Sequence, residues 1–300
     1  MASTVIQGLG WFVRRTTNDP LALAAFYEAA VGLRAVRPPR EGFRNRMLWA
    51  GDIAMFETAA RAASPAGAAR IGDAVPVLRA RDYEAAKAAA LAAGARLQRE
   101  ETASGRAAYL LDPDGLPFGL WQAPDAPTFP PDVLADEIWR AGGIALPGIA
   151  KPPPAIQDMA SVNLKVADPI AMAGFYRAAL ELDLLGPPAP EGATLALGRT
   201  CILELLPGGV ERPPPGNRDE VPDVFILRVY DLDWLEGRIQ RAGARIVARM
   251  EITGGRLIYA LDPEGHLFGL QQRAPELLPA GAAERVEDGV ARALWESGTR

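Results

Sequence analysis

The sequence contains a long internal duplication, and no other feature restricts its possible folds so strongly. The segment AGARLQREETASGRAAYLLDPDGLPFGLWQ at 93–122 returns as AGARIVARMEITGGRLIYALDPEGHLFGLQQ at 242–272, and NDPLALAAFYEAAVGL at 18–33 returns as ADPIAMAGFYRAALEL at 167–182. Matching positions stay 149 or 150 residues apart, which indicates two copies of one domain. We therefore predict a first domain at 8–123, a Pro-rich linker with a short helix at 124–158, a second domain at 159–273 and a helical tail at 274–300.

Each copy divides again into two similar units. In SVNLKVAD at 161–168, apolar and polar residues alternate as in a half-buried strand, and Asp168 with Pro169 is typical of a helix start. Short strands separated by Gly and Pro follow, and the same order returns at 223–272. The predicted fold class is α+β, with tandem domains that each pair two βαβββ modules into a half-open barrel. The concave face of each barrel forms a cup.

Two motifs in each copy resemble the vicinal oxygen chelate superfamily, which includes glyoxalase I, extradiol dioxygenases and bleomycin-resistance proteins. The first motif runs from an aspartate to a Phe-Tyr pair (Asp19 to 26–27, and Asp168 to 175–176), and the second is the turn at 112–115 and 262–265. The resemblance covers most of the chain outside the linker and both tails. It implies the paired-module fold, but it does not imply one activity, because this superfamily hosts many reactions.

The resemblance also implies where metal-dependent members place their ligands, usually His, Gln or Glu on the first and last strands of each module. In the first copy these positions hold Phe12, Glu57, Val75 and Gly119, and in the second they hold Ser161, Glu204, Val224 and Gly269. One carboxylate per cup is too few for a divalent ion, which needs about three protein ligands. We therefore expect neither a metal at this place nor another cofactor. The single histidine, His266, is expected to be an exposed turn residue.

Glu57 and Glu204 are the candidate catalytic residues. Strand alternation adds further residues to the two predicted cups as ligand-binding candidates. The first cup would hold Phe12, Arg14, Val75, Gly119 and Trp121, and the second would hold Ser161, Asn163, Lys165, Val224, Gly269 and Gln271.

Two alternatives stay open for these cup residues. Lys165 could neutralise Glu204 as a structural pair, or an unpaired Glu204 could have a raised pKa and act as a base. A glycine inside a strand, such as Gly119 or Gly269, indicates the close approach of either a ligand or a facing aromatic ring.

Net charge and composition limit the classes of partner that this protein is expected to bind. A net charge of −5 argues against nucleic acid or an anionic membrane surface, and no apolar run is long enough to span a bilayer. Cys201 is the only cysteine, and the N-terminus lacks the pattern of a signal peptide, so we expect a cytoplasmic protein. The basic residues are nearly all arginine, which suggests a bacterial gene. Four modules in one chain are compatible with a monomer or a homodimer.

Three functions follow from these observations. The first is binding of a small organic molecule in one or both cups without a metal, similar to the bleomycin-resistance proteins. The second is a metal-independent isomerase, lyase or cyclase that uses Glu57 or Glu204 as a general base. The third is a metal-dependent glyoxalase- or dioxygenase-like enzyme. Metal analysis separates the third function from the others, and recovery of an unchanged ligand separates binding from catalysis.

Overall fold

The computed structural model describes residues 6–35, 45–50, 54–60, 74–102, 105–122, 156–197, 201–209, 221, 223–229, 231–252 and 255–273. Most of the predicted linker and the predicted tail lie outside these ranges. Within them, a first strand followed by a helix and further strands recurs as four modules. Module 1 contains β1 (Ile6–Thr17), α1 (Pro20–Val31), β2 (Arg34–Ala35), β3 (Arg46–Ala50) and β4 (Ala54–Ala60). Module 2 contains β5 (Ala74–Ala80), α2 (Tyr83–Ala92), β6 (Arg96–Glu101), β7 (Arg106–Leu111) and β8 (Pro117–Gln122).

The second copy of the duplication supplies the other two modules. Module 3 contains β9 (Ile156–Val166), α4 (Pro169–Leu180), β10 (Ala193–Leu197) and β11 (Cys201–Pro207). Module 4 contains β12 (Asp223–Val229), α5 (Leu232–Arg241), β13 (Arg245–Ile252), β14 (Gly255–Leu261) and β15 (Leu267–Arg273). The α+β class and the modular organisation predicted from the sequence are confirmed. None of these helices is both long and apolar enough to cross a membrane.

An aspartate starts each helix directly after the first strand of its module. Asp19 accepts hydrogen bonds from the backbone N–H groups of Leu21 and Ala22 at 3.2 and 3.0 Å, and Asp168 caps α4 in the same way. Asp82 and Asp231 cap the other two helices. These side chains satisfy N–H groups that the helix itself cannot bond. The chain therefore turns at the same point in all four modules.

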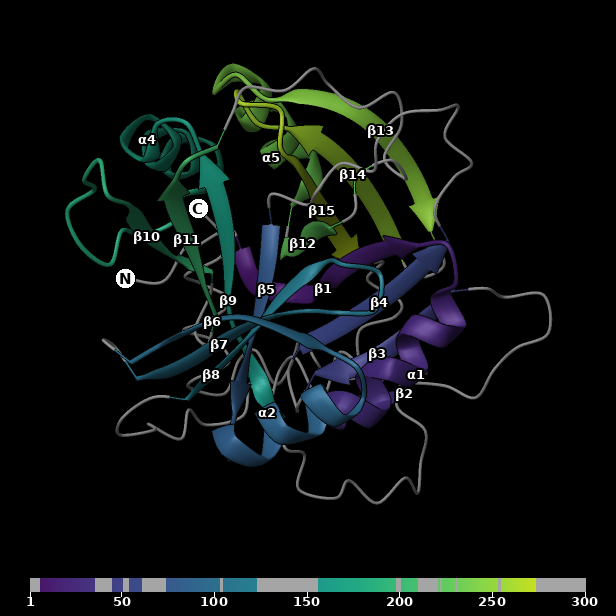
Figure 1. Cartoon of the computed structure of the whole chain (residues 1–300). Coiled ribbons are helices and arrows are strands. Elements are labelled where there is room, and N and C mark those ends of the chain that lie inside the picture. Colours follow the sequence, from purple (N-terminus) through teal and green to yellow (C-terminus); the bar gives the residue numbers. More distant parts are fainter. Residues whose placement is uncertain are drawn as a thin grey trace, which may run out of the picture.

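The described strands form two mixed sheets, with the helices against one face of each (Figure 1). One sheet has eight strands in the order β13-β14-β15-β12-β1-β4-β3-β2, and the other has seven in the order β10-β11-β9-β5-β8-β7-β6. Module 1 is thus joined to module 4, and module 2 to module 3. The sequence-based expectation that each copy pairs its own two modules was wrong.

The crossed pairing follows the same register in both sheets. Phe12 on β1 pairs with Ile226 on β12, and Ser161 on β9 pairs with Val77 on β5. The second pair is the first one shifted by the repeat distance, because Ser161 corresponds to Phe12 and Ile226 corresponds to Val77. The first strands of all four modules present similar edges for pairing. The sequence pattern within one module therefore does not predict which other module it pairs with.

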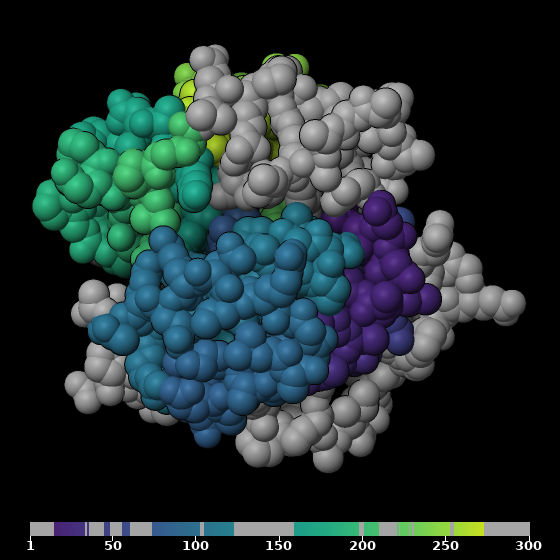
Figure 2. Space-filling view, in the orientation of Figure 1, coloured from purple at the N-terminus to yellow at the C-terminus, as the bar shows by residue number. Residues whose placement is uncertain are grey.

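The helices hold together the modules that the sheets separate. Helix α1 contacts α2, and α4 contacts α5, so the two modules of one copy pack through their helices. Figure 2 shows modules 1 (purple) and 2 (blue) side by side on one face of the molecule. One continuous apolar core lies between helices and sheets and includes Phe26, Phe118, Phe175 and Phe268. Burial of this core is the main stabilising contribution.

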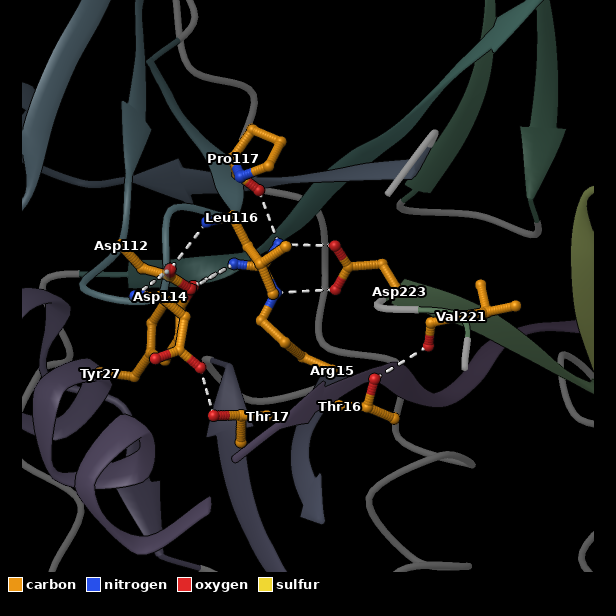
Figure 3. Close-up of polar contacts among 10 residues, drawn as sticks. All are labelled: Arg15, Thr16, Thr17, Tyr27, Asp112, Asp114, Leu116, Pro117, Val221 and Asp223. Carbon is orange, nitrogen blue, oxygen red and sulfur yellow. Dashed lines mark hydrogen bonds and ion pairs between the residues drawn. The ribbon is translucent and has the colours of Figure 1, made fainter. Parts of the chain in front are cut away.

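A buried arginine connects three of the modules (Figure 3). Arg15 on β1 is fully buried and makes a bidentate contact with Asp223 on β12, at 2.7 and 2.9 Å. Its other nitrogen donates to Asp112 in the β7–β8 turn at 2.8 Å and to the Tyr27 hydroxyl. Burial alone would lower the pKa of Arg15, but the charges of Asp223 and Asp112 outweigh it and raise this pKa.

The second copy neutralises the corresponding aspartate differently. His266 Nδ1 lies 2.8 Å from Asp262 Oδ2, and Nε2 lies 2.9 Å from the carbonyl oxygen of Lys165. The Asp262 carboxylate and the Lys165 carbonyl are both acceptors, so each can take a hydrogen bond from a ring nitrogen that carries a proton. The prediction of an exposed His266 was wrong, since only 6% of its surface is accessible. His266 is a buried partner of the Asp262 carboxylate, and the sequence pattern of the turn did not predict this contact.

Candidate functional site

The faces opposite the helices are the two cups, and they differ in chemistry. We call the concave face of the seven-stranded sheet the polar cup and that of the eight-stranded sheet the apolar cup. Strand alternation assigns residues to them, because their neighbours belong to the core on the helix side. Leu203 and Leu205 lie in that core, so Glu204 between them faces the polar cup. By the same argument, Phe56 places Glu57 in the apolar cup.

A hydrogen-bonded chain of side chains lies across the polar cup. Ser161 Oγ donates to Asn163 Oδ1 at 2.6 Å, and Asn163 Nδ2 donates to the Tyr109 hydroxyl at 3.3 Å. Asn163 also hydrogen bonds Glu204, its direct neighbour on β11. Ser161 and Asn163 are almost completely buried, whereas Glu204 and Tyr109 are partly accessible. The buried amide thus orients two groups that solvent or a ligand can reach.

Glu204 has the electrostatic properties of a reactive or ligand-binding carboxylate. Burial is the main reason that its pKa is raised, and the negative charge of Glu101 adds to this shift against the opposing hydrogen bond from Asn163. No ion pair joins Glu204 to any part of the chain that the structure describes. Lys165 is exposed and forms no such pair. The structural pair that the sequence left open is therefore absent within the described ranges.

Two aromatic rings in the polar cup each lie beside an arginine. The Arg99 guanidinium is 4.2 Å from the centre of the Tyr109 ring, and that of Arg79 is 5.5 Å from the centre of the Trp121 ring. Burial, followed by the charges of Glu101 and Glu204, raises the pKa of Tyr109. Its hydroxyl therefore stays protonated at neutral pH and can take part in hydrogen bonds.

The crossed sheets redistribute the predicted site residues between the cups. The polar cup combines positions expected in different copies: Ser161, Asn163, Glu204, Val75, Gly119 and Trp121. The apolar cup combines Glu57, Val224, Gly269 and Gln271 with the backbone positions of Phe12 and Arg14, whose side chains lie outside the described part. The expectation that Phe12 and Trp121 share a cup was wrong, because β1 and β8 belong to different sheets.

The apolar cup contains a second group of buried hydrophobic residues. Its members are Val224, Ile226, Leu257, Tyr259, Leu261 and Leu267, with Met47, Val221, Ala248, Met250 and Ile252 packed against them. Glu57 is partly buried at one side of this cup, next to Met47 on β3, and accepts a hydrogen bond from Asn45 at 3.1 Å. Glu57 and Glu204 are equivalent in sequence, but their surroundings differ.

Aliphatic side chains cover the glycines at two of the positions where the resemblance implies metal ligands. A Cβ atom on Gly119 would lie 2.9 Å from Val77 Cγ2, and one on Gly269 would lie 2.8 Å from Ile226 Cγ1. These distances are shorter than van der Waals contact. The branched residue on the first strand therefore occupies the space of any side chain at the glycine. The sequence left a ligand or an aromatic ring as alternatives. The nearest side chain is the β-branched one, and a tyrosine, Tyr109 or Tyr259, pairs with the glycine on its other side.

The residues of the cups do not fit the metal that the fold implies. Each cup holds one carboxylate among the four family positions, and the glycine position cannot accept a ligand while its neighbour is in place. Among the described side chains, no three His, Cys, Asp or Glu residues gather as a metal site would require. A facial site needs about three such ligands.

Sequence reasoning missed Tyr109, Arg79 and Arg99 as residues of the polar cup. A signal for the tyrosine existed, because Tyr109 returns as Tyr259 in the second copy and each pairs with the strand glycine beside it. The two arginines carried no such signal, since only the folded sheet brings them to the rings of Trp121 and Tyr109.

Comparison with known proteins agrees with this architecture. Residues 11–121 match a family described as the glyoxalase-like domain. Glyoxalase I from Zea mays has 18% sequence identity and a TM-score of 0.60, covering 89% of this chain and 92% of the maize chain. A candidate dioxygenase from Bacillus subtilis has 16% identity and a TM-score of 0.62, covering 100% of this chain and 91% of the other. At these identities the likeness concerns the fold. No curated protein sequence matches significantly.

Proposed function

We propose that this chain is a member of the vicinal oxygen chelate superfamily and binds a small polar organic molecule in its polar cup without the metal used by other members. The observation that carries the proposal is the state of Glu204. It is a partly accessible carboxylate with a raised pKa, oriented by Asn163 and without a cationic partner among the described residues. Such a group supplies a hydrogen-bond acceptor for a ligand.

The other residues of the cup indicate the kind of ligand. Glu204 favours a ligand with O–H or N–H donors, and the Tyr109 hydroxyl adds a group that can donate or accept. The ring of Trp121, with Arg79 beside it, provides a surface for a flat portion of the ligand. Glu57, Val224 and Gly269 belong to the other cup and are not part of this proposal.

A second candidate function is metal-independent catalysis, such as isomerisation, elimination or cyclisation, with Glu204 as general base. The raised pKa favours it, because a carboxylate whose pKa approaches the working pH is a better proton acceptor. The neighbouring Tyr109 hydroxyl is then available to hydrogen bond an oxygen on the substrate. A metal-dependent reaction is the least compatible with the covered positions at Gly119 and Gly269.

In the described residues, the four modules pair with one another within a single chain. This arrangement supports a monomer as the working unit, since no cup needs a strand from a second copy. A homodimer would leave the two cups unchanged, so the proposal concerns one chain and a small-molecule ligand. Size-exclusion chromatography with light scattering tests the oligomeric state directly.

Thermal-shift screening of small polar organic compounds tests binding. A ligand at one hundred times its Kd stabilises the folded state by about 2.7 kcal/mol. The substitution Glu204→Gln is expected to weaken a hit, while Glu57→Gln is the matched control, because it makes the same change at the equivalent position of the other cup. Equal effects of the two substitutions would contradict the assignment to the polar cup.

Incubation of the hit with the protein separates binding from catalysis. Recovery of the unchanged compound by mass spectrometry supports binding. Turnover that Glu204→Gln abolishes and Glu57→Gln preserves supports the general base. Stoichiometric metal in the purified protein, lost on Glu204→Ala, would overturn the metal-free proposal.

A further inference from the structure

The turn between β14 and β15 is fastened to the end of β9 by three polar contacts. His266 Nε2 lies 2.9 Å from the carbonyl oxygen of Lys165. The Glu264 carboxylate accepts hydrogen bonds from the backbone N–H groups of Ala167 and Asp168 at 2.6 and 3.1 Å. These contacts lie where β9 ends and α4 begins, so a turn of module 4 holds the strand-to-helix corner of module 3. We call these three contacts the module clamp.

The other side of the His266 ring faces a carboxylate that accepts several further hydrogen bonds. Nδ1 lies 2.8 Å from Asp262 Oδ2, and that oxygen also accepts from the Tyr176 hydroxyl at 2.9 Å. Asp262 Oδ1 accepts from the backbone N–H groups of Glu264 and His266 at 3.0 and 2.8 Å. Donors on both oxygens favour the charged carboxylate over the protonated acid. Asp262 is therefore an acceptor toward the ring.

The ring of His266 thus lies between two acceptors, and both it and Asp262 are buried. A neutral imidazole has one N–H group and one lone pair, so either tautomer places a lone pair against an acceptor, whereas imidazolium donates to both. We infer that the module clamp is a pH-sensitive switch, which is closed while His266 is imidazolium and weakens when the ring loses its proton. This inference does not rest on the ligand proposed for the polar cup.

The other titratable groups around the ring do not share its range of pH. Carboxyl and amino side chains ordinarily titrate far from neutral pH, whereas imidazole titrates at about pH 6.5. Burial, followed by the charge of Asp262, raises the pKa of Tyr176 well above its ordinary value, so this hydroxyl stays protonated. Because the folded state favours the charged ring, the stability that the clamp contributes is present at low pH and is lost as rising pH deprotonates the folded ring. The groups that the described contacts place around His266 are Asp262, Tyr176, Glu264, Asp168 and Lys165, whose side chain is exposed.

The first copy has a corresponding contact that does not titrate. Asp112 is the counterpart of Asp262, and it contacts Arg15, whose guanidinium keeps its proton in proteins. Leu116 occupies the position that corresponds to His266. The first copy is therefore a control within the same molecule, and we expect pH dependence only in the second copy.

Nitrogen-15 NMR of the imidazole tests the charge directly, because the chain contains one histidine. At about pH 7.5, where a free imidazole is about nine-tenths neutral, we expect both ring nitrogens of His266 to carry protons. The spectrum of either neutral tautomer at that pH would overturn the inference. A ring that keeps its proton up to the pH of global unfolding would overturn it too, since such a ring could not switch.

Hydrogen exchange of the full-length protein, followed by mass spectrometry on both sides of the pH at which the ring deprotonates, tests the switch. After correction for the intrinsic effect of pH, we expect exchange in 163–168 and 262–268 to rise about tenfold, because a hydrogen bond to a charged group contributes roughly that factor. The corresponding segments of the first copy, 14–19 and 112–118, should keep their protection. An equal change in both copies, or no change in either, would contradict the switch.

Two substitutions assign the effect to the imidazole. His266→Gln removes the titrating group, so the pH-dependent exchange should disappear. Tyr176→Phe removes another hydrogen bond to Asp262 but leaves the imidazole in place, so the pH dependence should remain. The opposite result for either variant would overturn the inference. If His266→Gln does not fold, the NMR spectrum of the unsubstituted protein still decides the charge of the ring.

Discussion

The substitution Arg15→Met is expected to cause one of the largest losses of stability in this protein. Arg15 is fully buried and contacts Asp223 through two nitrogens, Asp112 through a third contact and the carbonyl oxygen of Pro117 at 2.6 Å. Methionine has a similar length and fills much of the same space, so the change mainly removes charge and hydrogen bonds. It removes the cation that lies beside two buried carboxylates.

The size of the stability loss depends on the hydrogen bonds that each carboxylate keeps after the substitution. Asp112 still accepts hydrogen bonds from the backbone N–H groups of Asp114 and Leu116, at 3.0 and 2.9 Å, so its loss is partly offset. Asp223 loses the bidentate contact itself. Breaking a buried pair by removing one partner costs about 3–5 kcal/mol, and we expect about 4 kcal/mol here. For a chain of this size, about 2 °C per kcal/mol gives a Tm lower by about 8 °C.

Chemical and thermal denaturation followed by circular dichroism measure this loss. The matched control is Arg256→Met, which breaks an exposed bidentate pair with Asp233 at 2.7 and 3.0 Å and should cost less than about 1 kcal/mol. A triple variant that adds Asp112→Asn and Asp223→Asn to Arg15→Met should recover part of the stability, because no buried charge remains unpaired. A loss below about 1 kcal/mol for Arg15→Met alone would refute the reasoning.

Three further predictions concern single positions. Gly119→Ala should cost about 1–3 kcal/mol through the clash with Val77, and Val77→Ala in the same chain should reduce that cost in urea unfolding; additive losses would contradict the contact. Because the pKa of Glu204 is raised in the folded protein, its contribution to stability is lost as pH rises. Glu204→Gln should therefore gain in Tm relative to the original protein as pH increases above the ordinary value of 4.5, and a pH-independent difference would argue against the shift. Asp168→Ala should cost about 1 kcal/mol by uncapping α4, and an unchanged unfolding midpoint would contradict that role.

Local structure could be predicted from the sequence because it depends on neighbours along the chain. The aspartate before each helix, the alternation in 161–168 and the duplicated turns all act within a few residues. The modules were therefore identified correctly. The partner of each module depends instead on contacts between distant strand edges, and four similar first strands leave several pairings compatible with the same pattern.

The candidate site, like the fold, was predictable where it depends on positions matched along the chain and not where it depends on contacts between distant strands. Matching positions between the copies predicted Glu57 and Glu204 as the one carboxylate among the four ligand positions of each cup, and the two residues lie in different sheets. The surroundings of Glu204 could not be predicted, because Asn163 comes from β9, Tyr109 from β7 and the charge of Glu101 from β6. His266 is an example. Its place in a turn predicted an exposed side chain, but its ring contacts Asp262 on one side and the carbonyl oxygen of Lys165 on the other, and the sequence did not indicate these contacts.

The crossed pairing has a consequence for how the two cups diverge. The polar cup takes Glu204 and Asn163 from the second copy but Tyr109 and Trp121 from the first. Neither copy alone contains a complete cup, so a substitution in one half alters a surface that the other half completes. The proposed function, like the fold, therefore depends on both copies. Their cups can still specialise, because the equivalent positions Trp121 and Gln271 lie in different sheets and change different cups.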